Sequence, residues 1–414
     1  MSDHPVTVLG AGIVGICTAL ALVEKGHAVR VIDRKAPGQE TSFGNAGVIS
    51  PWSVVPQAMP GVWKQIPNLM FGTYKPLSVH ARSWPRMLRW GLTFLRKGTE
   101  AQARATSDAM SVLCAPSIDL YRRYLTDAGA AHLVKDAMYV HAFRDGSNVT
   151  LSSLDYTIRR EKGADLELIG ADALRALEPA LSHDFQAAVL VKGQARATAP
   201  EQICQVLAQH AAALGVEFER DAIQSLSKDG ADWVIRCEAQ TFRAASVVIA
   251  LGAWSRDVLR PLGVTVPLMA ERGYHVEYPL PQIDIANSVM DTDAKVVASA
   301  MEGGVRVAGQ AEFAPLDAPE DPRKSARLRR IAKAMFPDLD TEGEKTWMGR
   351  RPSFPDSLPA LGQIGKHEGL FANFGHCHYG LMMAPKSGQI IASCVSGRPP
   401  NEDIRRMNPM RFAT

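Results

Sequence analysis

The sequence predicts an α/β fold with two domains, one around a parallel sheet and one of α+β type built on an antiparallel sheet. An apolar strand, a glycine-rich turn, a helix and a second strand follow one another in residues 5–33. The same alternation returns in residues 196–255, and it is typical of parallel sheets. Residues 264–313 instead alternate polar and apolar positions between glycine-containing turns, which predicts antiparallel strands.

The composition narrows the class of protein. A chain of 414 residues is long enough for two or three domains, and 46% hydrophobic with 21% charged residues excludes disorder, collagen and coiled coil. The net charge of +3 gives no reason to expect a nucleic-acid partner. Six scattered cysteines without a C-x-x-C pair favour a reducing compartment and argue against a zinc ribbon. No stretch approaches eighteen apolar residues, and the N-terminus lacks signal-peptide features, so we expect a cytoplasmic protein.

The first turn carries the motif GAGIVG, in which Gly10, Gly12 and Gly15 match G-x-G-x-x-G. The first glycine permits the tight turn, the second lets the backbone approach a pyrophosphate, and the third lets helix and strand pack closely. The helix then presents its free N–H groups to the phosphates. Asp33 ends the second strand, where an acid binds an adenosine ribose. Residues 5–33 therefore predict a Rossmann-like dinucleotide-binding unit.

Two further segments indicate which dinucleotide binds. Arg34 follows the acid, and ETSFGNAGVISP (40–51) is rich in small and polar residues; VVIALGAWS (247–255) ends a strand in a small-residue turn. Taken alone, each is equally well an ordinary loop or strand end. After GAGIVG, they resemble the D-amino-acid oxidase and glycine oxidase superfamily of flavoproteins. The resemblance implies FAD as the cofactor.

A third motif lies near the C-terminus. GRRPSFPDSLPALGQIG (349–365) resembles the family pattern G-x-R-P-x-x-P-D-x-x-P-x-x-G. Arg351 matches the arginine that fixes the substrate carboxylate, and a guanidinium suits this role because it makes two parallel N–H bonds. Arg350 stands where the pattern leads us to expect an apolar residue. The alternative is an arginine that holds a domain interface.

The last motif, NFGHCHYGLMMAPKSGQIIASCVSG (373–397), is similar to the family's final segment. In the family, a glycine turn and a helix N-terminus face the flavin's pyrimidine edge, where the positive helix end stabilises negative charge. His376, Cys377 and His378 are too close in sequence to predict a metal site. In the sarcosine oxidases, the cysteine that is linked to the flavin lies near the R-P motif. The corresponding R-P segment here (349–365) has no cysteine, so the resemblance implies noncovalent FAD.

Two other segments leave alternatives open. ERGYHVEYP resembles the family's strand facing the substrate, which implies that Tyr274 binds the carboxylate, although a half-buried strand with a polar face in solvent is an equal alternative. SWPRMLRWGLTFLRKG (83–98) predicts a helix with apolar residues on one face and basic residues elsewhere. A domain helix with a solvated basic edge is the favoured interpretation, and peripheral contact with an inner membrane is the alternative.

The resemblance covers nearly the whole chain. The insertion from about 52 to 129, together with SFGNAG, most resembles D-amino-acid dehydrogenases, including those acting on D-proline-like and D-hydroxyproline-like substrates. It implies oxidative deamination by hydride transfer from the α-carbon to flavin N5, giving an imine or 2-oxo acid, with electrons passed to a quinone or other non-oxygen acceptor. The alternatives are a glycine- or sarcosine-type oxidase using oxygen and an FAD-carrying subunit of a larger oxidoreductase.

These motifs specify the expected site and domains. The residues implied to act on the substrate are Arg351, Tyr274 and His378. The residues expected to bind FAD are Gly10, Ala11, Gly12, Ile13, Val14, Gly15, Asp33, Arg34, Thr41, Ser42, Asn45, Ala46, Gly47, Val48, Ile223, Gly252, Trp254, Gly349, Gly375, His376, Gly380 and Leu381. We expect an FAD-binding domain of the glutathione-reductase type from residues 1–55, 145–260 and 345–414. The substrate domain with its helical insertion takes 56–144 and 261–344.

Overall fold

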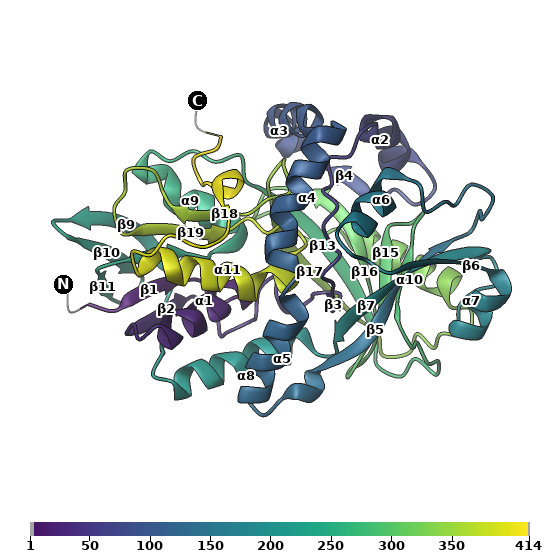
Figure 1. Ribbon diagram of the computed structural model, residues 1–414, viewed down its shortest axis with the longest axis horizontal. Helices are drawn as coiled ribbons and strands as arrows, with labels where there is room; N and C mark the ends of the chain where they lie inside the picture. Colours follow the sequence, from purple (N-terminus) through teal and green to yellow (C-terminus); the bar gives the residue numbers. More distant parts are fainter. Residues whose placement is uncertain (1–3, 413–414) are drawn as a thin grey trace.

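The computed structural model describes residues 4–412 and contains two large sheets side by side (Figure 1). The first has six strands in the order β18-β19-β12-β1-β2-β8. All its neighbours pair in parallel except β18 and β19. Its strands are β1 (Val6–Leu9), β2 (Val29–Asp33), β8 (Glu217–Arg220), β12 (Val247–Ile249), β18 (Ala360–Gln363) and β19 (Leu370–Phe374).

Both faces of the six-stranded sheet are covered, which explains why its strands are continuously apolar. Val8 and Val31 pack on the side of α1 (Ile13–Glu24), α8 (Pro200–Ala213) and α11 (Gly380–Val395). Leu9 and Ile32 point the other way, into a core shared with β9 (Ile223–Asp229), β10 (Asp232–Cys237) and β11 (Thr241–Ala244). The parallel α/β unit expected from the sequence is confirmed.

The second sheet has ten strands and is mostly antiparallel. Eight of them follow the order β17 (Lys345–Ser353), β13 (Met269–Tyr278), β16 (Gly304–Phe313), β15 (Val296–Met301), β14 (Ser288–Asp291), β5 (Val134–Phe143), β7 (Ala187–Ala197) and β3 (Val48–Ile49). Two more, β4 (Leu77–Val79) and β6 (Leu166–Gly170), pair with β16 and β7. One face packs on α7 (Ala171–Leu177) and α10 (Pro322–Met335). The expected antiparallel domain is confirmed.

The remaining helices lie between or beside the sheets. They are α2 (Val62–Phe71), α3 (Trp84–Lys97), α4 (Glu100–Cys114), α5 (Ser117–Asp127), α6 (Leu154–Glu161) and α9 (Ser255–Leu259). The sequence predicts one helical stretch over 105–129, but the structure divides it into α4 and α5. Pro116 lies at the break, because proline lacks the N–H that would continue the first helix.

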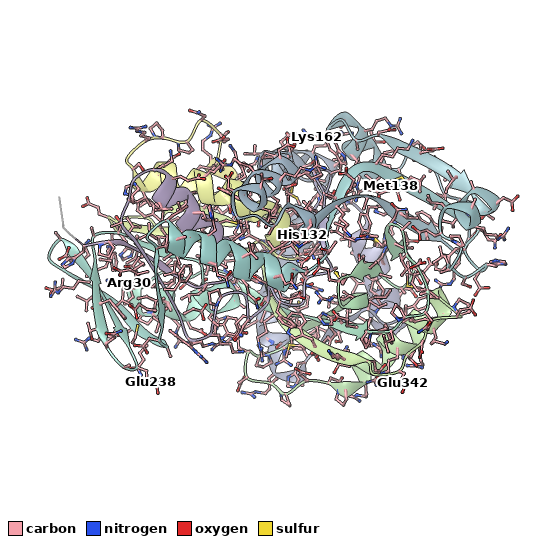
Figure 2. All side chains as sticks on the ribbon, turned by 90° about the horizontal axis from the view of Figure 1, so that it is seen from below. Arg30, His132, Met138, Lys162, Glu238 and Glu342 are labelled. Atoms are coloured by element: carbon pink, nitrogen blue, oxygen red, sulfur yellow. The ribbon has the colours of Figure 1, made fainter. Side chains whose placement is uncertain are left out.

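The sheets divide the chain differently from the expected domain boundaries. Residues 166–197 and 345–353 were expected in the FAD domain, but they supply β6, β7 and β17 to the ten-stranded sheet. Figure 2 shows Arg30 and Glu238 toward one end of the molecule and Met138 and Glu342 toward the other. We propose that the domains follow the sheets, so that the chain passes between them more often than the sequence indicates.

Candidate active site

A large cavity lies between the two sheets. It has a volume of about 1550 Å³, and its wall comes from the ends of the parallel strands, one face of the ten-stranded sheet, and α2, α3 and α6. Pockets for small ligands typically measure roughly 300–1,000 Å³, so this cavity has room for a dinucleotide and a second small molecule. The carboxyl end of a parallel sheet is where such folds bind ligands.

At the parallel-sheet end, the motif glycines shape the backbone. A side chain at Gly15 would overlap the carbonyl oxygen of Gly10, and Gly10 itself has a left-handed φ of 110°. Gly12 precedes α1 and, having no side chain, does not cap the helix itself; Gly12, Ile13 and Val14 line the cavity. The N-terminus of α1 therefore faces the cavity, where a helix favours an anionic group.

Asp33 is held where the second strand ends. Its carboxylate accepts hydrogen bonds from the backbone N–H groups of Ala11 at 2.7 Å and Lys35 at 3.0 Å. Burial raises the pKa of Asp33, while these two donors oppose the rise. Next to it, Arg34 pairs with Glu40 and lies 4.3 Å from the centre of the Trp254 ring. These residues border the same end of the cavity.

The segment 40–48 contacts β17 of the ten-stranded sheet. The Thr41 hydroxyl donates to the carbonyl of Arg350, and Ser42 accepts from the N–H of Ile13 at 3.0 Å. A side chain at Gly44 would overlap the Trp347 ring, so this backbone approaches β17 as closely as glycine allows. Thr41, Ser42, Asn45, Ala46 and Val48 line the cavity.

The C-terminal motif borders the cavity where β19 of the parallel sheet ends and α11 begins. Gly375 has a φ of 88°, and a side chain there would overlap the Phe354 ring. His376 is buried, lies 3.3 Å from the Ser387 hydroxyl, and has its pKa lowered to about 3 by burial. Burial raises the pKa of the Cys377 thiol to about 12, which makes it a poor nucleophile. Gly380 begins α11, so this helix also presents its positive end to the cavity.

Most of the residues expected to bind FAD reach the cavity. Four of them, Gly10, Ala11, Gly15 and Gly47, do not line it: the three glycines shape the backbone beside the cavity, and the N–H of Ala11 donates to Asp33. The residues that line the cavity are Gly12, Ile13, Val14, Asp33, Arg34, Thr41, Ser42, Asn45, Ala46, Val48, Ile223, Gly252, Trp254, Gly349, Gly375, His376, Gly380 and Leu381.

Arg351 reaches the cavity from β17 across β13. One guanidinium nitrogen donates to Glu271 and to the carbonyl of Gln310, both at 3.0 Å. The side chain passes over Gly273, where a Cβ would overlap the guanidinium. Burial alone would raise the pKa of Glu271, but Arg351, His378 and the Ser353 hydroxyl together lower it below its usual value. A negative charge is therefore fixed behind a guanidinium that faces open space.

The neighbouring Arg350 points elsewhere. Its Nε donates to the carbonyl of Leu316 at 2.9 Å, and the residue is absent from the cavity wall. Successive residues of a strand face opposite sides of the sheet, so only one of the two arginines can enter the cavity. His378 lies on the same wall as Arg351, and one ring nitrogen is 3.1 Å from the amide of Gln57. Its side chain is exposed to the cavity, and the enclosing protein lowers the pKa of His378 below its usual value, with Glu271 opposing and Arg351 reinforcing the shift.

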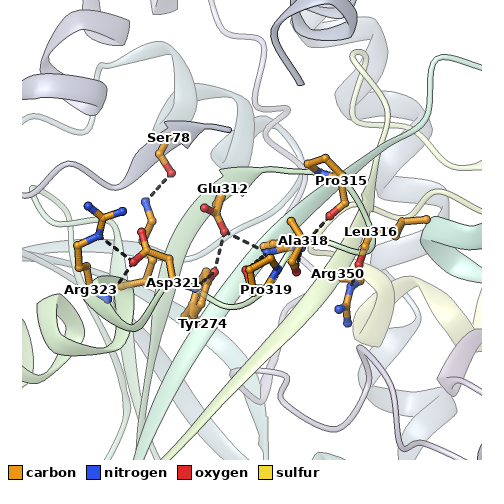
Figure 3. A network of polar contacts seen from close by, with 12 residues as sticks. Ser78, Tyr274, Glu312, Pro315, Leu316, Ala318, Pro319, Asp321, Arg323 and Arg350 are labelled. Atoms are coloured by element: carbon orange, nitrogen blue, oxygen red, sulfur yellow. Dashed lines mark hydrogen bonds and ion pairs between the residues drawn. The ribbon is translucent and has the colours of Figure 1, made fainter. Parts of the chain in front are cut away.

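Tyr274 contributes to the cavity wall, but its hydroxyl does not point to open space (Figure 3). It donates to the Glu312 carboxylate at 2.6 Å, and the ring belongs to the core beneath α10. Its neighbour Arg272 is buried and donates to the carbonyls of Pro315, Ala318 and Pro319, so it fixes the loop after β16. This geometry weighs against direct carboxylate binding by Tyr274.

His275 follows Tyr274 on β13 and faces the other side of the sheet from it. Its ring stacks on Trp347 with centroids 5.0 Å apart, and one nitrogen lies 3.2 Å from the carbonyl of Gly44. Burial lowers the pKa of His275 to about 3. It therefore supports the segment 40–48 from outside the cavity wall.

The sequence did not indicate several polar residues of the cavity. Glu271 and Gln310 hold Arg351, and Gln310 has a left-handed φ of 64°. A second polar wall contains His141, Arg159 and Lys295. Glu271 begins the segment ERGYHVEYP, but nothing in that segment singles it out. No motif contains the other four residues, since they meet only through tertiary contacts between strands, turns and helix α6.

The donor set fits a bound FAD. Two buried atoms on the wall, Oδ1 of Asn373 and Nε2 of Gln310, have no hydrogen-bond partner within the protein, and buried polar groups normally have one. The N-terminus of α1, the Asp33 carboxylate and the N-terminus of α11 surround the same space. Among residues 4–412, no group of three or more His, Cys, Asp or Glu side chains could hold a metal ion.

Comparisons with known proteins identify the family of the chain. The family model described as FAD dependent oxidoreductase matches residues 5–394. A D-amino-acid oxidase of Bradyrhizobium diazoefficiens is 33% identical over 415 residues, covering 98% of each chain. A D-amino acid dehydrogenase of the same organism is 30% identical over 416 residues, covering 99% of each.

Solved structures show the same fold. Glycine oxidase from Geobacillus kaustophilus superposes with a TM-score of 0.75 at 20% identity, covering 99% of this chain and 98% of the other. L-proline dehydrogenase from P. horikoshii gives a TM-score of 0.77 at 18% identity with the same coverage. Since the family model spans most of the chain and two full-length relatives are at least 30% identical to it, the chain belongs to the family of FAD dependent oxidoreductases.

Proposed function

We propose that this enzyme is a D-amino-acid dehydrogenase, with D-proline-like and D-hydroxyproline-like compounds among its candidate substrates. The observation that carries the proposal is Arg351, whose guanidinium faces the cavity while Glu271 and the Gln310 carbonyl fix its position. A fixed guanidinium that is not fully enclosed suits a substrate carboxylate. FAD, when bound, would supply the redox chemistry by accepting a hydride, which is one proton with two electrons, from the substrate α-carbon.

The residues around Arg351 would orient the substrate. Glu271 is buried and ionised, so it holds the guanidinium in one orientation. A fixed guanidinium lowers the entropy that is lost when the substrate reaches a reactive orientation. The pKa of His378 is lowered below its usual value, which favours the neutral ring, and this ring can exchange hydrogen bonds without adding charge. A strong base in the protein is unnecessary if the substrate amine arrives neutral. The imine product then hydrolyses to a 2-oxo acid and ammonia, or remains cyclic when the amine is secondary.

The acceptor and the chirality are the finer parts of this proposal. The name of one relative, a D-amino acid dehydrogenase, supports a quinone or another non-oxygen acceptor. The second relative is called an oxidase, which favours oxygen as the competing candidate. Both names support D-amino acids. We place the protein in the cytoplasm or peripherally on the inner membrane; among residues 4–412, no helix is long and apolar enough to cross a bilayer.

Anaerobic bleaching of the flavin absorbance tests the proposal. The holoenzyme is mixed with matched D- and L-amino acids, including proline, 4-hydroxyproline, glycine and sarcosine. We expect bleaching by D-isomers alone. Bleaching by L-isomers would overturn the assigned chirality, and bleaching by none would favour an FAD-carrying subunit that needs a partner.

Reoxidation of the bleached enzyme then separates the two acceptors. We expect a water-soluble short-chain quinone to restore the absorbance much faster than air does, with little peroxide formed. Rapid recovery in air with one peroxide per substrate would identify a glycine- or sarcosine-type oxidase instead.

A further inference from the structure

The helices α2 and α3 contribute little to any core, although they are rich in large apolar residues. No residue of α2 is buried, and Trp90 is the only buried residue of α3. Ten large hydrophobic residues are exposed among residues 4–412, and six belong to these two helices. They are Trp63, Phe71, Trp84, Leu88, Leu92 and Leu95. We call these six residues the apolar surface. Such a concentration marks a contact site, because scattered single residues are the norm.

The apolar surface is embedded in a strongly basic segment. Residues 51–99 contain seven Lys or Arg and no Asp or Glu. Since the whole chain carries +3, the remaining residues carry three minus seven, or −4. Within the part of the chain that the structure describes, no carboxylate lies within 4 Å of the basic groups of Lys64, Arg86, Arg89, Arg96 or Lys97. Their charge is therefore free to meet an external anion.

We propose that the apolar surface docks on an anionic lipid bilayer. Aromatic and leucine side chains beside Lys and Arg are the composition of helices that lie in a membrane interface. Basic residues near an anionic leaflet add attraction, and tryptophan favours the boundary between headgroups and acyl chains. The basic surroundings disfavour a second copy of this chain, because two such segments would repel each other.

The same helices form the rim of the active-site cavity. Leu88, Leu92 and Leu95 line the cavity as well as being exposed, and Ile66 and Leu69 of α2 line it too. Both helices lie at the same edge of the molecule in Figure 1. A docked enzyme would therefore open its cavity toward the lipid, where a lipid-soluble quinone could enter. This second half of the inference rests on the proposed function, whereas the docking itself does not.

Vesicle co-sedimentation of the holoenzyme tests the docking. The double variant Trp63→Glu/Phe71→Glu alters residues that are 60% and 74% exposed and do not line the cavity. The matched control is Leu280→Glu, at 62% exposure, outside these helices. We expect the wild type to bind phosphatidylcholine vesicles containing phosphatidylglycerol. The double variant should bind about 30-fold or more weakly, and the control should bind normally.

The charges are tested in the same assay. Arg86→Glu/Arg89→Glu should also weaken binding about 30-fold or more, whereas Arg330→Glu on the basic helix α10 should not. Binding by the wild type should fall as salt rises or when phosphatidylglycerol is omitted. An equal loss in the Leu280 control, or no wild-type binding at low salt, would overturn the proposal.

Two further readouts keep the outcomes distinct. Sedimentation velocity that shows a dimer abolished by Trp63→Glu/Phe71→Glu would assign the surface to a second copy and overturn lipid docking. Flavin bleaching by substrate should be the same in the double variant and the wild type. Vesicle binding without bleaching by any amino acid would support the docking and contradict the proposed function. Bleaching without vesicle binding would support the proposed function and contradict the docking.

Discussion

The two ends of the cavity are built from different kinds of atoms. At the parallel-sheet end, the wall is shaped largely by backbone: Gly12 and the start of α1, the turn glycines 10 and 15 behind them, and N–H groups that hold Asp33. At the antiparallel end it is made by side chains in pairs, above all Arg351 with Glu271. One end lies almost within one stretch of chain, while the other needs strands far apart in sequence.

This difference predicts how each end fails. A site shaped by backbone should fail when a side chain is added where none fits, because the same backbone contacts hold the fold together and shape the cofactor site. A paired side-chain site fails when one partner is removed, because a buried charge is left without its counterion. The predictions below test this contrast, beginning with the largest expected effect.

Gly15→Val should abolish the parallel-sheet end. The new side chain would overlap the carbonyl of Gly10, so α1 would have to move away from the first strand. We expect protein that purifies without flavin and loses roughly 4 kcal/mol or more of unfolding free energy. Absorbance at the flavin bands and urea denaturation measure both effects. Gly170→Ala is the control, since nothing lies within 4 Å of its Cβ position; a flavin-loaded Gly15 variant of normal stability would contradict the contrast.

Arg351→Ala should damage the antiparallel end while leaving FAD bound. Losing two charge-assisted hydrogen bonds to a substrate carboxylate should lower kcat/KM at least about 100-fold, mainly through KM. Steady-state kinetics with the best D-amino acid measures this. The adjacent Arg350→Ala is the control and should change kcat/KM less than about threefold, because Arg350 points to Leu316 outside the cavity. Equal effects of both variants would refute the assignment of Arg351.

The buried histidines should make both ends sensitive to acid. The pKa of His376 is about 3 in the fold, below the value of about 6.5 in an unfolded chain, so the unfolded state binds the extra proton as pH falls. Stability should therefore fall below about pH 6.5, by up to roughly 1.4 kcal/mol per pH unit for each such histidine. Urea midpoints from pH 7 to 4.5 measure the slope. His376→Asn should flatten it, and His183→Asn at the surface controls for the substitution; an unchanged slope would contradict the prediction.

Tyr274→Phe should have the smallest effect and should decide the role of this residue. The variant removes the hydrogen bond to Glu312, and bonds to charged groups are worth about 1.5–3 kcal/mol. We expect a loss of stability of that order and a change in KM of less than about twofold. Thermal denaturation and steady-state kinetics measure the two quantities. A tenfold rise in KM at normal stability would show instead that the hydroxyl reaches the substrate.

The sequence by itself determined the parallel-sheet end and the cofactor class. GAGIVG, its flanking strand and helix, and Asp33 are local, so their geometry follows from backbone sterics within one βαβ unit. The family resemblance of the R-P segment also placed Arg351 on the cavity wall. In both cases the information lies within a few neighbouring residues, and a linear pattern can carry it.

The tertiary structure alone decided what surrounds Arg351 and how far α2 and α3 are exposed. Glu271 lies opposite Arg351 because β13 and β17 pair in that register, and Gln310 joins them from β16. The sequence marked α3 as amphipathic and favoured a solvated basic edge, but its apolar face is exposed as well. Strand register and helix burial depend on contacts between residues far apart in the chain, and so no local pattern determines them.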